Sequence, residues 1–407
     1  MYIHDFRVQN YMIHQDTSIS LQPLTVLVGP NGGGKSALFD AMLNFSMLSR
    51  GNIQQAFGPY PYSYRATIYR GSSDISRIGF EVLMSEAKDS DIQLKYQLKY
   101  SQTENQTFTI FDEKLTQIPG DKTIFDRSEV DRYPDLSRLK LEGDRSLFSA
   151  VRMRSTSSES EINNLLEYLT KQISKFNKFL LEPSTLAAPS RLPDLVSEST
   201  TALPPRIGHR GEDLAATLYF LSETEHPSYS MICEKVRELV PEFSGFGFSA
   251  VGTDRIAFAV KYSDPRESIP SVRLSAGTLI YIGLIVLVLT PNRPPVLMIE
   301  EPENALTPQA IKAFYQAVRG LAFNEDPDQR SQILLSSHSP FVICEAWNGE
   351  DRDFIHQVRV KDGKALVRKF SSIIEEQGIH LGKDEDGQRN ILSLKNAEEI
   401  MSGYLSE

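Results

Sequence analysis

The sequence predicts an α/β protein with a mixed or parallel core sheet, and three features support this class. An apolar run, Leu24–Val28, leads through a glycine-rich loop into a helix-forming segment that ends near Leu48. Residues 278–335 alternate between helix-like and strand-like patterns, which is typical of a parallel sheet. Residues 77–115 alternate apolar and polar side chains, which indicates an antiparallel, half-exposed β subdomain.

The glycine-rich loop, residues 29–36, fits the pattern G-x-x-x-x-G-K-[ST] of a phosphate-binding loop. Its glycines let backbone N–H groups turn onto phosphate oxygens, and the N-terminus of the following helix adds a partial positive charge. A lysine at this position reaches the outer phosphates, and the next hydroxyl ligates Mg²⁺. We therefore predict that the chain binds a nucleoside triphosphate through Asn31, Gly32, Gly33, Gly34, Lys35 and Ser36.

Composition bounds the remaining functions. The chain has 407 residues, of which 40% are hydrophobic and 24% charged, as in a globular protein with more than one lobe. Its net charge of −10 argues against a broad nucleic-acid-binding surface. The longest apolar run, residues 279–289, is too short to cross a bilayer, and the N-terminus lacks a secretory signal pattern. With two isolated cysteines, Cys233 and Cys344, we expect a cytoplasmic protein that does not contact a membrane.

The elements between the phosphate loop and the second half of the chain are expected as strands followed by a helix. Strands are predicted over residues 78–83, 92–100 and 108–111, where the side-chain pattern has a period of two. Apolar residues then recur at helical spacing over residues 161–181, which predicts a single amphipathic helix.

Two adjacent carboxylates follow a buried strand over residues 296–299. The carboxyl ends of parallel strands point to the ligand crevice, so these acids are expected beside the bound phosphates. We assign Glu300 to the metal shell and Glu301 to the general base that polarises the attacking water. Taken alone, the pair would be read as surface acids; the phosphate loop upstream favours the catalytic reading.

Two further motifs fit a phosphate site less specifically. His338 follows an apolar strand and is positioned to sense the γ-phosphate, but a structural histidine is as good a reading of that residue alone. Ser275 and Gly277 precede a long apolar helix, where they form either a simple helix cap or a second anion-binding site. Two such helix starts in one chain are redundant unless two subunits share a nucleotide.

Along the chain these four motifs occur in the order phosphate loop, Ser275 with Gly277, Glu300 with Glu301, and His338. In this order they resemble the ATPase heads of the ABC class. More narrowly, they are similar to RecF/SMC-like AAA ATPases of OLD-type and related anti-phage defence systems, such as those of Septu or PARIS type. The resemblance covers nearly the whole chain. It implies ATP and Mg²⁺ as cofactors and a homodimer that sandwiches ATP, in which Ser275 and Gly277 touch the γ-phosphate bound by the partner. In that arrangement Glu301 and His338 are the catalytic residues.

The resemblance also divides the chain and exposes departures from the family pattern. Residues 1–119 would form the N-terminal part of the head, 120–229 a helical and linker insertion, and 230–407 the C-terminal part. A glutamine after the first helix usually reaches Mg²⁺ in such heads; Gln54 and Gln55 are the nearest candidates, and we take Gln55 as a metal ligand.

Four residues depart from the pattern of relatives. Ala276 and Thr278 stand where transporters usually have glycine and glutamine. Glu300 replaces the usual aspartate, so the metal shifts slightly and slow ATP turnover is expected. Thr307 stands where relatives often carry histidine, which leaves the role of that position open.

The expected function is ATP hydrolysis coupled to a separate effector. OLD-type nucleases append a Toprim nuclease domain, but too few residues follow Pro340 for one. We therefore expect a homodimer or larger homo-oligomer that acts as a sensor or scaffold in anti-phage defence, with a nuclease or toxin encoded nearby as its partner. The alternative is a RecF-like ATPase that clamps DNA on dimerisation, so DNA contact stays open. A transporter subunit fits poorly because of the strand-rich insertion and because the signature motif, residues 274–278, is altered at Ala276 and Thr278.

Overall fold

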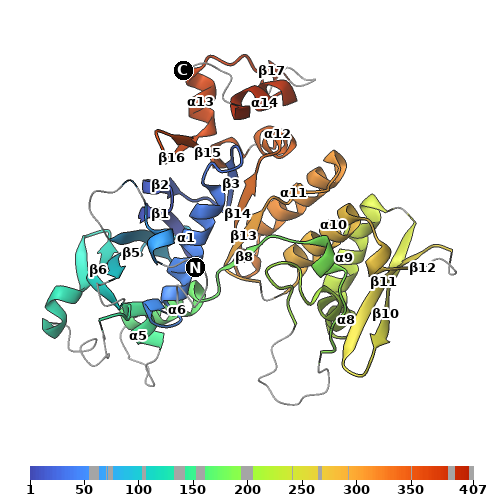
Figure 1. Ribbon diagram of the computed structural model, residues 1–407, viewed down its shortest axis with the longest axis horizontal. Coiled ribbons are helices and arrows are strands. Elements are labelled where there is room, and N and C mark those ends of the chain that lie inside the picture. Colours follow the sequence, from blue (N-terminus) through green and yellow to red (C-terminus); the bar gives the residue numbers. More distant parts are fainter. Residues whose placement is uncertain are drawn as a thin grey trace.

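The computed structural model places a six-stranded sheet at the centre of the molecule (Figure 1). It describes residues 1–54, 64–69, 71, 77–102, 107–132, 143–152, 161–193, 205–240, 242–264, 268–291, 293–349, 351–383 and 390–402. The strand order is β16-β15-β3-β14-β13-β8. These strands are β3 (Leu24–Val28), β8 (Asn177–Phe179), β13 (Val296–Glu300), β14 (Gln332–Ser337), β15 (Ile355–Lys361) and β16 (Lys364–Lys369). β16 pairs antiparallel with β15 and the other neighbours are parallel, so the predicted α/β class with a mixed core sheet is confirmed.

The central sheet separates two hydrophobic cores, because successive residues of a strand face opposite sides. The helices on its faces are α1 (Lys35–Leu48), α11 (Pro308–Ala322) and α12 (Pro340–Asn348), and α10 (Ala276–Leu289) packs against α11. In β13, Leu297 and Ile299 pack in the core that contains α10, α11 and α12. Val296 and Met298 pack in the core that contains α1. Burial on both faces explains the continuous apolar runs of β3, β13 and β14.

The second sheet is antiparallel and packs on the α1 side. Its order is β2-β1-β4-β5-β6-β7, with β1 (Tyr2–Tyr11), β2 (His14–Ser20), β4 (Ile78–Ser85), β5 (Gln93–Gln102), β6 (Phe108–Ile118) and β7 (Lys122–Asp126). The predicted meander is confirmed as β4, β5 and β6. In β5, Tyr96 and Leu98 are buried on the same face of the sheet, and Gln97 between them points to the other face, as the period-two pattern requires.

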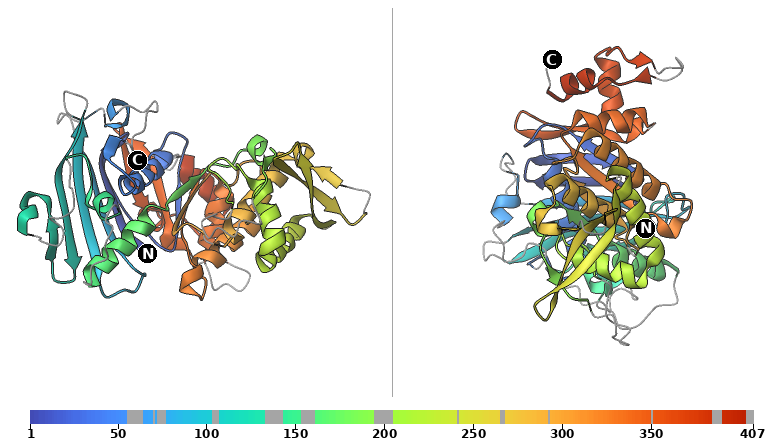
Figure 2. Two further views of the ribbon diagram at one scale, coloured as in Figure 1. Left: turned by 90° about the horizontal axis from the view of Figure 1, so that it is seen from below. Right: turned by 90° about the vertical axis from the view of Figure 1, so that its right-hand side faces the viewer.

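A third unit, the signature lobe, combines helices α8 (Leu214–Thr224), α9 (His226–Leu239) and α10 with a small antiparallel sheet. The strands of that sheet are β9 (Ser190–Arg191), β10 (Phe243–Val251), β11 (Arg255–Tyr262) and β12 (Ser268–Pro270). Figure 2 shows the signature lobe and the large antiparallel sheet at opposite ends of the molecule, with the central sheet between them.

Short elements complete the described part of the chain. They are α3 (Tyr64–Thr67), η1 (Arg127–Arg132), α5 (Leu147–Arg152), α6 (Glu161–Ile173), α7 (Pro183–Leu186), η2 (Ser271–Arg273), η3 (Pro327–Gln329), η4 (Arg352–Phe354), α13 (Phe370–Glu376), β17 (Gly382–Lys383), β18 (Asn390–Ile391) and α14 (Leu394–Ser402). Among the described residues, no helix combines the length and the apolar character needed to cross a bilayer.

The single helix expected over residues 161–181 is wrong. The helix α6 ends at Ile173, and after a short turn Asn177–Phe179 forms strand β8 at the edge of the central sheet. Pairing with β13 overrides the helical spacing of the apolar residues, because Phe176 and Phe179 are buried equally well at the end of a turn and in a short strand.

The division of the chain at residues 119 and 229 stays a prediction. Two elements next to these boundaries pack with the neighbouring unit. β7 continues the antiparallel sheet beyond residue 119, and α8 packs with α9 and α10 although it precedes residue 229.

Candidate nucleotide-binding site

The phosphate loop connects the carboxyl end of β3 to the N-terminus of α1. Gly34 caps the helix with φ 108°, and the first helical turn contains no acidic residue, so the helix N-terminus is open to an anion. A Cβ atom on Gly29, whose φ is 152°, would lie 2.0 Å from the carbonyl oxygen of Val358 in β15. Glycine is therefore required at the start of the loop by the strand that supports it.

Lys35 is buried at the base of the loop. Its ammonium group donates hydrogen bonds to the carbonyl oxygens of Gly29 (2.8 Å) and Pro30 (3.0 Å). Burial lowers the pKa of Lys35, and the nearby carboxylates Glu301, Glu303 and Glu300 offset part of that effect. The lysine therefore lies within the electrostatic field of the acids at the end of β13, as predicted for one phosphate site.

Glu301 follows β13 in an unusual backbone conformation. Its φ is 45°, in the left-handed region that non-glycine residues seldom adopt. Two contacts hold it there: its N–H donates to the Ser336 carbonyl at 2.9 Å, and its Oε2 accepts from the Asn304 side-chain amide at 3.0 Å. Strained backbone of this kind concentrates at functional sites. The turn directs the Glu301 carboxylate out of the sheet, where it stays about one-third exposed.

Glu300 occupies the last position of β13, and its side chain is almost fully buried. Its Oε2 lies 3.4 Å from the ammonium nitrogen of Lys178 in β8, whereas its Oε1 is buried without a hydrogen-bond partner. An orphaned carboxylate oxygen beside a phosphate loop fits a hard cation, because Mg²⁺ is usually held by one or two carboxylates together with substrate phosphates. Ser36, which is exposed at the start of α1, is the residue predicted to supply the hydroxyl ligand.

Lys178 is a site residue that sequence reasoning missed. Besides Glu300, its ammonium group contacts Asp40 of α1 at 2.6 Å. Burial opposes the charged form, yet the carboxylates of Asp40 and Glu300 outweigh burial and raise the pKa of Lys178. The sequence pattern placed Lys178 in a predicted helix, because the apolar residues around it have helical spacing. The pairing of β8 with β13 is what brings it to the site.

His338 and Glu303 form the opposite side of the acidic cluster. The Glu303 carboxylate accepts hydrogen bonds from the Ser337 hydroxyl (2.7 Å) and the His338 backbone N–H (2.8 Å). The His338 Nδ1 lies 3.4 Å from Glu303 Oε1 and 3.9 Å from Glu301 Oε1. The structure thus brings His338 and Glu301 together as predicted. It adds Glu303, to which the sequence assigned no role, as the residue that orients the end of β14.

Ser275 and Gly277 begin α10 in the signature lobe, apart from α1 and the phosphate loop in the central body (Figure 1). Ser275 is exposed and caps the helix, its hydroxyl accepting from the Thr278 N–H at 3.1 Å. Gly277 packs on the loop after β13: a Cβ there would lie 2.5 Å from the Ala305 carbonyl oxygen. The start of α10 is therefore exposed at Ser275, and at Gly277 it packs against the backbone of the loop that follows β13.

The predicted glutamine ligand is not located. Gln55 lies outside the described residues and its role stays a prediction. Gln54 is exposed beyond the far end of α1, and this helix of 14 residues extends about 20 Å from the phosphate loop. Among the described residues, no group of three or more His, Cys, Asp or Glu side chains could hold a metal ion by itself.

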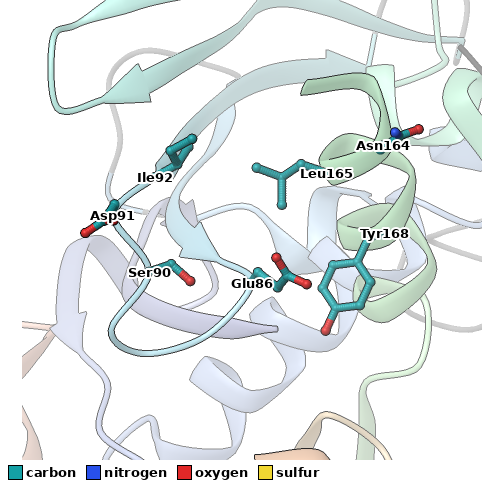
Figure 3. A pocket seen from close by; sticks show the side chains of 7 residues that line it. All are labelled: Glu86, Ser90, Asp91, Ile92, Asn164, Leu165 and Tyr168. Atoms are coloured by element: carbon teal, nitrogen blue, oxygen red, sulfur yellow. The ribbon is translucent and has the colours of Figure 1, made fainter. Parts of the chain in front are cut away.

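Two clefts of the described surface lie away from the phosphate loop. One of about 550 Å³ opens between the β4–β5 connection and α6, where Leu165 and Tyr168 face Ile92 and Glu86 (Figure 3). The charged residues that line it, Glu86 and Asp91, are both acidic, so this cleft does not suit a triphosphate.

A phosphate loop after β3, two carboxylates at the end of β13, and a separate lobe with a capped helix start define an ATPase head of the ABC type. Residues 24–344 match the family described as "AAA domain, putative AbiEii toxin, Type IV TA system". The chain belongs to this family.

One curated relative and two solved structures extend the comparison. The OLD nuclease of Thermus scotoductus is 24% identical, over 98% of this chain and 71% of that protein. An SMC head bound to the C-winged helix domain of ScpA is 12% identical and aligns with a TM-score of 0.51 over 92% of this chain and all of that chain. The SMC head domain from Thermotoga maritima, also 12% identical, reaches 0.46 over 91% and 99%. The first of these heads shows the fold, so the predicted resemblance to an OLD-like, SMC-type ATPase head is confirmed.

Proposed function

We propose that this ATPase head hydrolyses ATP in a homodimer whose two nucleotides lie between the subunits. The observation that carries the proposal is the separation of the two phosphate-binding helix starts. The loop before Lys35 and the exposed cap at Ser275 belong to different lobes of one chain, so one nucleotide meets both only when two copies associate. A two-fold arrangement would pair each loop with the partner's cap.

The proposed mechanism assigns one task to each residue. Lys35 and the loop N–H groups bind the phosphates, and Glu301 accepts a proton from the water that attacks the γ-phosphorus. His338 lies on the same side as Glu301 and stabilises charge on the γ-phosphate. Ser36 and the free oxygen of Glu300 would hold Mg²⁺, which neutralises phosphate charge when bound.

Mixing two inactive variants tests whether the site is shared. Lys35→Ala removes a phosphate contact and Ser275→Arg blocks the signature, so each variant alone should lose nearly all ATPase activity. In a mixed dimer, the intact loop of one subunit faces the intact Ser275 of the other. With random exchange of subunits, the mixture should regain about one quarter of the parent activity, because half of the dimers carry one intact site.

A double variant carrying both changes supplies the control. Mixed with either single variant, it offers no pair of intact halves on one nucleotide and should stay inactive. Absence of recovery in the first mixture, with dimers shown by mass measurement, would overturn the shared site. Each variant must first match the parent in circular dichroism and thermal unfolding.

We propose further that the head works in the cytoplasm of a prokaryotic cell as a sensor or scaffold for a separate nuclease or toxin in anti-phage defence. The OLD nuclease relative and the family name support this context. Co-purification with the product of the neighbouring gene tests it. ATP-dependent retention on circular DNA without such a partner would instead favour the RecF-like clamp.

A further inference from the structure

Lys178 joins two parts of the site that no local motif connects. It lies on β8, and its ammonium nitrogen bridges Asp40 of α1 at 2.6 Å and Glu300 of β13 at 3.4 Å. The Lys178 side chain is 11% exposed and that of Glu300 6%, so this arm of the bridge is buried, whereas the Asp40 side chain is 34% exposed. Exposed ion pairs contribute little, but a buried bridge fixes the geometry of its partners.

The bridge lies on the metal-facing side of α1. Asp40 follows Ser36 by four residues, so both side chains project from the same face of the helix. The Lys178 ammonium therefore connects the helix that carries one proposed metal ligand to the strand that carries the other. A shift of either element would lengthen one of the two contacts.

The two oxygens of Glu300 are thereby given different tasks. Oε2 faces Lys178, and Oε1 is buried without a partner among the described residues. A carboxylate that is fixed through one oxygen can offer only the other to a cation. A freely rotating Glu300, one methylene longer than aspartate, would lose rotamer freedom each time it bound the metal.

We propose that Lys178 is a positioning residue for the metal site: it holds Glu300 in the rotamer that presents Oε1 to Mg²⁺ and fixes that oxygen relative to Ser36. This inference rests on the proposed nucleotide site. Lys178 does not itself touch phosphate or metal. It restrains a glutamate side chain, which is one methylene longer than that of aspartate. The other reading is a salt bridge that only stabilises the fold.

Metal-dependent nucleotide binding separates these two readings. A fluorescent ATP analogue is titrated onto each variant, first with EDTA and then with increasing MgCl₂. Lys178→Met should raise the Mg²⁺ concentration for half-maximal enhancement of binding by about 10- to 100-fold, the usual cost of removing a partner that orients a metal ligand. Binding in EDTA should match the parent protein, because the phosphate loop is intact.

Three further variants make the result decisive. Lys175→Met removes an exposed lysine three residues earlier and should leave the magnesium titration unchanged. Lys178→Arg keeps the charge and should restore part of the magnesium response. Asp40→Asn releases Lys178 from α1 and should shift the titration in the same direction by a smaller factor; it decides the matter if Lys178→Met does not fold.

A magnesium titration of Lys178→Met, or of Asp40→Asn in its place, that overlays that of Lys175→Met would overturn the positioning role. Lower thermal stability with an unchanged titration would identify a structural salt bridge. Lys35→Ala is measured in parallel. If that variant binds the analogue as tightly as the parent, the proposed nucleotide site fails, whatever Lys178 does.

Discussion

At the scale of single residues, the site depends on one strained position. Glu301 adopts a φ of 45°, which costs a non-glycine residue about 1–3 kcal/mol. The contacts to Ser336 and Asn304 hold it there. A regular continuation of β13 would place the Glu301 side chain on the sheet face opposite to that of Glu300. The turn instead takes the Glu301 carboxylate out of the sheet, toward Asn304 and His338.

We expect Glu301→Gln to bind ATP with nearly the parent affinity and to lose about 10²- to 10⁴-fold of the hydrolysis rate, because an amide cannot accept the proton of the attacking water. Single-turnover phosphate release and equilibrium binding of labelled ATP measure the two quantities. A variant that hydrolyses ATP at the parent rate would exclude Glu301 as the base. The amide keeps an acceptor for Asn304, so the turn should be retained.

The residues that the sequence could predict are those whose chemistry is local. Lys35 and Ser36 belong to one contiguous loop, and Glu300 and Glu301 follow a readable strand. Lys178 was missed because its role comes from two partners more than 100 residues away along the chain. Glu303 was missed as well, because its hydrogen bonds to the end of β14 depend on two strands meeting at one edge of the sheet.

At the scale of elements, side-chain period predicted that the strands of the meander exist better than it predicted where elements end. The strand expected over residues 108–111 extends to Ile118 in β6, and the helix expected to reach residue 181 ends at Ile173. β5 has ten residues of alternating pattern, so its existence and its buried face could both be predicted. β8 has three residues, and its backbone pairing with β13 decides its conformation. Apolar spacing alone does not distinguish such a segment from the end of an amphipathic helix.

Two glycines in neighbouring helices provide a matched test of local packing. Gly277→Ala should destabilise the fold by about 1–3 kcal/mol, because its Cβ would lie 2.5 Å from the Ala305 carbonyl oxygen and that backbone must move. Gly320→Ala in α11 meets no atom within 4 Å and should stabilise the fold by about 0.5–1 kcal/mol. Urea unfolding measures both. Equal shifts of the same sign would contradict the contact between α10 and the loop after β13.

At the scale of the whole molecule, the central sheet interleaves distant parts of the chain. β3 lies between β14 and β15, so a strand from the first 30 residues is flanked by two from beyond residue 330. The fold class could be predicted because alternating helices and strands imply a parallel sheet. The strand order could not be predicted, since β3, β13 and β14 are buried on both faces and their sequences do not indicate which strand lies next to which.

ATP should convert the protein from a monomer to a dimer when hydrolysis is blocked. With Glu301→Gln, MgATP is expected to double the mass measured by light scattering, because each nucleotide joins the loop of one subunit to the exposed Ser275 of the other. EDTA should reverse the association, since the triphosphate would lose the cation that neutralises it. A mass that does not respond to nucleotide would contradict a shared site.

The contact between Gly29 and Val358 limits how the chain can be shortened. The stretch that matches the family ends at residue 344, yet the carbonyl under the first glycine of the phosphate loop comes from β15, which begins at Ile355. A protein trimmed to the matched stretch would expose one edge of β3 and remove the floor of its nucleotide loop. Such a fragment should aggregate or bind ATP poorly, although every recognised motif is present in it. The smallest autonomous ATPase is therefore larger than the stretch by which its family is recognised.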